Sequence, residues 1–156
     1  MTTLDGIFSL RTPLDLLGKL EADFRRMQLS DPHDQAAHYA AFDFFVTAEH
    51  LPDWVKHHSG GSLTLHRRYD DGALVSHIAS GAKHFHVEDE RHKKAKGTAI
   101  AGSFHSWSFS SSSFSPSSFD TSRLVVQLES GGAVDVLVVA ERVIDHWRGV
   151  LNGEVP

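Results

Sequence analysis

Apolar residues at helical spacing constrain the fold of this chain more than any other feature of its sequence. In the segment at about 12–28 they recur every three or four residues, which is typical of an amphipathic helix, with Thr12 as N-cap and Pro13 in the first turn. The clearest stripe lies at about 136–151, with Asp135 as N-cap and Gly153 just beyond the end. Both segments are predicted to be helices that bury one face in a shared core.

Two further helices are predicted between these segments. The first covers about 32–57 and starts with Asp31 as N-cap and Pro32 at the first helical position. Pro52 lies inside it and cannot donate a hydrogen bond to the carbonyl of Ala48, so we expect the helix to kink there or to end and restart. The second covers about 72–86, where Gly81 weakens the helical pattern by about 1 kcal/mol relative to alanine.

The pattern changes in the last third of the chain. Residues 122–135 contain RLVVQL, a Gly-Gly turn and a short return segment, which predicts a β-hairpin. Residues 87–121 show neither the helical nor the strand spacing of apolar residues and are predicted to form a long Ser/Phe-rich loop. The predicted fold class is therefore mainly α with a C-terminal β-hairpin (α+β). We expect a single domain over 1–156, built as a bundle of about four helices plus this loop.

The Ser/Phe-rich loop repeats Ser-Phe at five-residue intervals, which matches neither a helix nor a strand. Disordered segments are poor in aromatic residues, so these rings are expected to pack against something. The helical core of the same chain, a second copy and a different protein are all open as that surface. An exposed aromatic patch would favour a homo-oligomer, although a different protein partner also fits. The predicted interaction residues are Phe104, Trp107, Phe109, Phe114 and Phe119.

The composition limits the function classes. A formal charge of -5 and a pI near 6.1 argue against a protein whose main role is to coat nucleic acid. The chain has no cysteine, so disulfides and thiol nucleophiles are excluded, and any metal would need histidine and carboxylate ligands. The start lacks the pattern of a signal peptide, and no apolar run is long enough for a bilayer, so we expect a cytoplasmic protein with no membrane contact.

Histidine is unusually abundant, with twelve in the chain. His50, Asp53 and His57 can share one face of the helix predicted at 32–57, and the KHFH cluster follows on the next predicted helix. If these helices pack together, imidazole and carboxylate groups could hold a divalent metal. The candidate ligands are His50, His57, His84 and His86, and the candidate catalytic residues are His50, Asp53, Lys83 and His84. Surface histidines, with one or two packed between helices, are the structural alternative.

A basic cluster, RHKKAK at 91–96, follows the acidic EDE at 88–90. It suits a solvated charged loop, and the alternative is a contact with an RNA backbone beside Lys83 and His84, with Trp107 as a stacking surface. Nucleic acid is therefore a possible partner. The sequence contains no phosphate-binding loop, no nucleophile elbow and no dinucleotide fingerprint, so it offers no motif for the common nucleotide and hydrolase functions.

Two motifs, TAxHxxDW in FVTAEHLPDWV and IAxGxKHF in SHIASGAKHFHV, carry a family resemblance. Together with the Ser/Phe-rich loop, the hairpin and the Trp-containing last helix, they resemble a group of small uncharacterised bacterial proteins. The second motif is also distantly similar to the HEPN superfamily, which implies a helical fold and includes ribonuclease toxins and non-catalytic binding modules. Catalytic HEPN proteins carry a spaced Arg and His on a late helix. Here Arg26 and His33 cross a helix start, and Arg142 and His146 are one residue too close, so no ribonuclease residues are transferred.

Two hypotheses of function follow. The first is a non-enzymatic helical interaction module that self-associates. The second is a HEPN-like or metal-dependent enzyme that acts on RNA or another phosphate ester, with a divalent metal as the possible cofactor. A protein that binds metal without turnover would share the histidine site of the second.

Overall fold

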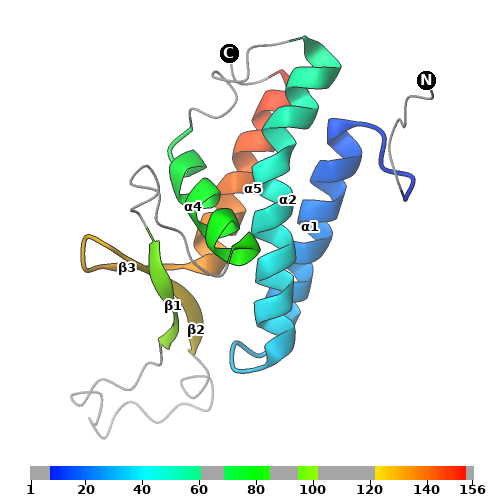
Figure 1. Ribbon diagram of the computed structural model, residues 1–156. Coiled ribbons are helices and arrows are strands. Elements are labelled where there is room, and N and C mark those ends of the chain that lie inside the picture. Colours follow the sequence, from blue (N-terminus) through cyan, green and yellow to red (C-terminus); the bar gives the residue numbers. More distant parts are fainter. Residues whose placement is uncertain (1–7, 61–68, 85–94, 102–121, 154–156) are drawn as a thin grey trace, which may run out of the picture.

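The computed structural model describes residues 8–60, 69–84, 95–101 and 122–153. Within these ranges the chain is mainly helical and carries a small antiparallel sheet, so the predicted α+β class is confirmed (Figure 1). In chain order the elements are α1 (Pro13–Leu29), α2 (Gln35–Ser59), α4 (Gly72–Lys83), β1 (Ala95–Ala101), β2 (Arg123–Leu128), β3 (Ala133–Asp135) and α5 (Val136–Asn152). No helix in the described part of the chain combines the length and the apolarity needed to cross a membrane.

Helix α1 begins with the capping residues that its sequence predicts. The Thr12 hydroxyl accepts from the Asp15 backbone N–H at 3.2 Å, and the Asp15 carboxylate accepts from the Thr12 N–H at 2.8 Å. The same carboxylate accepts from the Arg11 N–H, and this bond is the largest cause that lowers the pKa of Asp15. These contacts satisfy backbone donors that the first helical turn leaves open.

Helix α2 differs from its prediction at the start, and it continues through Pro52. Asp34, not Asp31, is the N-cap, because Asp31 instead accepts from the His33 N–H at 2.9 Å and forms a turn before the helix. The helix then runs through the buried Pro52 to Ser59 as one element. Of the two outcomes expected at Pro52, an end and restart of the helix is therefore wrong. Gly60 ends the helix in the left-handed conformation, with φ 67°.

Helix α4 is shorter than its prediction of about 72–86. It ends at Lys83, because His84 takes an extended conformation at φ -121° and forms the C-cap. The predicted hairpin forms from β2 and β3, where the Leu128 N–H donates to the Gly132 carbonyl at 2.8 Å across the turn.

Strand β1 lies inside the segment that we expected to be loop. It pairs antiparallel with β2, from Ala95 opposite Leu128 to Ala101 opposite Arg123, and makes the hairpin a three-stranded sheet in the order β1-β2-β3. Its sequence, AKGTAIA, is rich in small residues and has little local strand preference. Strand β1 is instead stabilised by its hydrogen bonds to β2, a partner that is distant in sequence.

One hydrophobic cluster holds the described elements together. It contains buried side chains from α1, α2, α4, α5 and β2. The most buried large members are Leu20, Phe44, Leu51, Val143 and Trp147. Helix α2 runs along the front of this bundle in Figure 1, between α1 and α4, and the sheet lies beside α4 and the start of α5.

Candidate functional site

One face of α2 points away from the core. Tyr39, Phe42, Val46, His50 and Asp53 follow one another at steps of three or four residues, and all are exposed except Val46, which is half-buried. We call these five residues the α2 outer face. The opposite face of the helix carries buried residues such as Phe44 and Leu51. The outer face therefore presents two aromatic side chains in its first half and two polar ones in its second.

Helices α1 and α4 border this face through polar contacts. On the α1 side Arg26 donates to Asp43 at 2.9 Å, and it also pairs with the buried Asp23 at 2.8 Å. The hydrogen bonds to these two carboxylates raise the pKa of Arg26. On the α4 side the Ser76 hydroxyl donates to the Glu49 carboxylate at 2.6 Å. Both borders are held by bonds within the chain.

The structure brings two of the candidate catalytic residues together. The Nζ atom of Lys83, at the end of α4, lies 3.1 Å from Nε2 of His50 on α2. An ammonium group has only donors, so the contact requires a neutral imidazole whose Nε2 accepts. The arrangement places a cation and a potential proton acceptor side by side at an exposed position.

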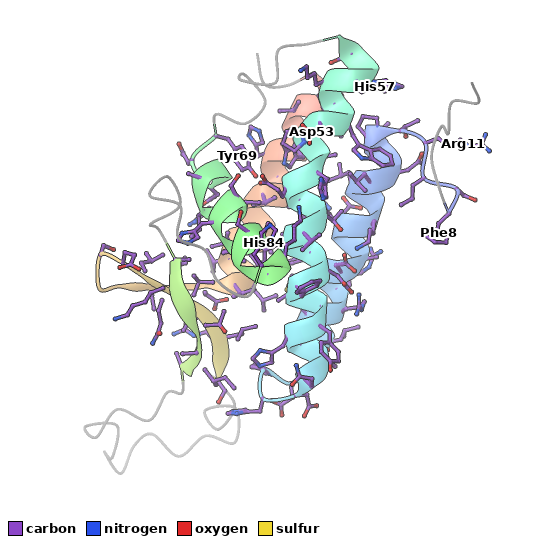
Figure 2. All side chains as sticks on the ribbon, viewed as in Figure 1. Phe8, Arg11, Asp53, His57, Tyr69 and His84 are labelled. Carbon is purple, nitrogen blue, oxygen red and sulfur yellow. The ribbon has the colours of Figure 1, made fainter. Side chains whose placement is uncertain are left out.

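The other two candidate catalytic residues lie at different places. Asp53 is one helical turn beyond His50 on α2, about 4.5 Å further along the helix axis. His84 is the exposed C-cap of α4, next to Lys83. In Figure 2 the labels of Asp53 and His84 are well apart, which places them at different levels of the bundle.

The proposed metal ligands spread along α2 and α4. His57 lies two turns after His50, near the C-terminal end of α2, and Figure 2 shows it far from His84. Across the ranges that the structure describes, no three histidine or carboxylate side chains gather in a way that could hold a metal ion. His86, the remaining candidate ligand, lies outside those ranges.

The predicted aromatic interaction surface also lies outside the described residues. Phe104, Trp107, Phe109, Phe114 and Phe119 all fall between 102 and 121. Their role as an interaction surface stays a prediction. The sequence-based search for a surface of this kind missed the aromatic residues of the α2 outer face, Tyr39 and Phe42, which are 61% and 47% exposed. A helical projection of residues 35–59 around the buried Ala and Phe positions identifies both.

Sequence reasoning also missed the junction that fixes the start of α4 on α5. The buried Asp71 carboxylate accepts two hydrogen bonds from Arg142, at 2.7 and 2.9 Å. Two residues before Asp71, the Tyr69 ring stacks on His146, which lies one turn after Arg142 on α5. The ring centroids are 4.2 Å apart and the ring planes differ by 9°. The visible signal was the spacing of Arg142 and His146, which places them one turn apart on one face of the last helix.

This junction alters the chemistry of Tyr69. Burial raises the pKa of Tyr69 above its ordinary range, and the carboxylates of Glu49 and Asp71 act in the same direction, while Trp147 partly opposes them. The ring also meets Trp147 edge-on, with centroids 5.7 Å apart. The side chain therefore stays protonated in the folded protein and packs the segment before α4 against α5.

Comparison with known proteins adds no relative to these observations. No family model, no curated protein and no solved structure matches the chain. A functional assignment therefore depends on the chemistry of the chain itself.

Proposed function

We propose that this protein is a non-enzymatic helical interaction module that self-associates in the bacterial cytoplasm. The exposure of Tyr39 and Phe42 on neighbouring turns of α2 carries this proposal. Full burial of a large apolar side chain contributes about 1.5–3 kcal/mol, so rings that are about half exposed would each add about 1 kcal/mol on association. Two copies that cover each other's rings would gain several such contributions.

The Ser/Phe-rich loop supports the same function from sequence. Its five aromatic residues, at positions between 104 and 119, would add a second surface of the same chemical kind. An interaction module built this way needs no cofactor, and its partner is a second copy or another protein.

The test is the mass of the untagged full-length protein in solution, measured by light scattering over a wide range of protein concentrations. We expect a defined oligomer whose population rises with concentration. A mass equal to the 17.2 kDa monomer at every concentration would contradict self-association.

A second candidate function is favoured by the contact of His50 with Lys83. If the Lys83 ammonium turned from His50 to a phosphate oxygen and stabilised its charge, Nε2 of the neutral imidazole would be released to accept a proton. A HEPN-like or metal-dependent enzyme that acts on RNA or another phosphate ester would use this pair, with Asp53 one turn away.

This candidate is tested by incubating RNA and a model phosphodiester with the protein, with and without added Mn²⁺ or Zn²⁺, beside elemental analysis of the purified protein. Cleavage that His50→Gln and Lys83→Met abolish, and that His33→Gln in the α1–α2 connection leaves intact, would support the enzyme. Cleavage that all three variants retain would reveal a contaminating nuclease.

A further inference from the structure

We propose that two copies of this chain pack antiparallel through the α2 outer face, with the twofold axis passing beside Val46. The inference rests on the proposed self-association and names its surface. The pairing follows from the order of side chains along α2, because this face matches a second copy of itself that runs in the opposite direction.

The spacing of the face is symmetric about Val46. Tyr39 and Asp53 each lie seven residues from Val46, and Phe42 and His50 each lie four residues from it. An antiparallel twofold pair exchanges the two halves, so Tyr39 of one copy faces Asp53 of the other. Phe42 then faces His50, and the two Val46 side chains meet at the axis.

The facing groups match chemically. The Tyr39 hydroxyl can donate to the carboxylate of Asp53 in the second copy, and a carboxylate can accept several hydrogen bonds at once. The Phe42 ring faces His50, where the Lys83 ammonium already lies 3.1 Å from the imidazole and can interact with the ring face. Each copy thus supplies one aromatic half and one charged half.

The geometry of α2 allows all these contacts in one interface. Residues 39 to 53 span about 21 Å along the helix axis, so a shallow crossing angle of about 20° keeps both ends within side-chain reach. The bordering residues Asp43 and Glu49 already bond to α1 and α4. In Figure 1 α2 lies at the front of the bundle, between α1 and α4.

The arrangement favours a second copy over an unrelated partner. An apolar partner helix would place apolar side chains against the exposed Asp53 and Lys83, and a charged one would place polar side chains against Tyr39 and Phe42. In an antiparallel pair, the aromatic half of each copy faces the charged half of the other copy.

Disulfide cross-linking of the full-length protein tests the register, because the chain has no cysteine of its own. A disulfide needs Cα atoms about 4.4–6.8 Å apart, which only a position beside the axis meets with its own copy. We expect Val46→Cys to form a covalent dimer under mild oxidation. Tyr39→Cys and Asp53→Cys should each stay uncross-linked alone, since each position lies about 10 Å from the axis, but a mixture of the two should cross-link.

A charge exchange supplies the complementary test and does not depend on new bonds. Tyr39→Glu places a carboxylate against Asp53 of the second copy and should weaken association by about tenfold to a hundredfold. Adding Asp53→Lys to the same chain should restore it. Tyr39 is exposed, so thermal melts of the Tyr39→Glu variant should show unchanged folding.

The outcomes separate this inference from the proposed function. If the wild-type protein oligomerises but Val46→Cys does not cross-link and Tyr39→Glu has no effect, the α2 contact is wrong while self-association stands. Cross-linking of Tyr39→Cys alone would show a different register and overturn the proposed axis. A wild-type protein that is monomeric at every concentration overturns both.

Discussion

The Asp71 carboxylate shows how one residue can fix the position of a whole helix. It is buried at the start of α4, and both of its oxygens accept from Arg142 on α5. Asp71→Asn keeps the size but removes the charge, so one buried bond is weakened and another is lost. We expect the free energy of unfolding to fall by about 1–2 kcal/mol, which chemical denaturation measures. The estimate stays modest because the Arg142 side chain is 50% exposed.

A second Arg–carboxylate pair on α5 provides the matched control. Arg148 bonds Glu21 of α1 at 2.8 Å, with both side chains substantially exposed. Glu21→Gln should change the free energy of unfolding by less than about 0.5 kcal/mol. Equal effects of the two substitutions would show that the Asp71–Arg142 ion pair contributes no more than an ordinary surface ion pair.

Tyr69 gives a prediction about alkaline pH. The protein has two tyrosines, so Tyr39→Phe leaves Tyr69 as the one tyrosine that absorbance can titrate. The folded state raises the pKa of Tyr69, so its contribution to stability is complete below the unfolded value of about 10 and is lost as the pH rises above it. We expect tyrosinate absorbance to appear only together with unfolding. If Tyr69 ionised near pH 10 while circular dichroism showed that the protein was still folded, the burial of Tyr69 would be contradicted.

At the residue scale, the sequence predicted contacts whose partners share a helix-helix interface and missed those that depend on a turn. His50 and Lys83 were named as candidate catalytic residues on two predicted helices, and their Nε2 and Nζ atoms lie 3.1 Å apart. The contact of Asp71 with Arg142 joins residues 71 positions apart, and no local period indicates it. Their pairing depends on where the assembled core, including α2, places the start of α4 relative to α5.

At the scale of elements, local patterns predicted each of the four described helices within a few residues at either end. Tertiary contacts decided the outcome where local preference was weak or left alternatives open. Pro52 is buried within a continuous α2, so packing on the core keeps the helix together despite the missing backbone bond. Strand β1 forms because β2 offers it a hydrogen-bonding edge, although its own residues favour no strand.

A histidine also ties β1 to the helices. The Ala95 N–H at the start of the strand donates to Nδ1 of His77 on α4, at 2.8 Å. His77→Leu removes that acceptor, and since a net hydrogen bond contributes about 1 kcal/mol, amide exchange in β1 should speed up by about fivefold to tenfold. The amides that pair β2 with β3 should keep their rates, as hydrogen exchange followed by NMR can show.

The matched control for this prediction is His84→Leu, since His84 is an exposed histidine at the C-cap of the same helix. It should leave exchange in β1 unchanged. If His77→Leu also leaves β1 unchanged, pairing with β2 alone holds the strand.

At the scale of the whole molecule, the Ser/Phe-rich loop and the α2 outer face are two candidate surfaces with different consequences for assembly. The loop prediction is tested by replacing Phe109 and Phe114 together by Ser. If the rings bridge subunits, light scattering should show a smaller species. A constant mass, with a melting temperature lower by several degrees, would instead show that the loop packs on its own domain.

The combination of variants then decides how many surfaces the assembly uses. Two twofold contacts on one chain close into a tetramer when their axes cross at right angles, whereas one contact gives a dimer. If both surfaces are used, Tyr39→Glu alone and the Phe109/Phe114 variant alone should each leave dimers, and all three substitutions together should give monomers. If the wild-type protein is a dimer held by α2, Tyr39→Glu should dissociate it and the loop substitutions should leave its mass unchanged. Dissociation by the loop substitutions alone would assign the contact to the loop and reject the α2 interface.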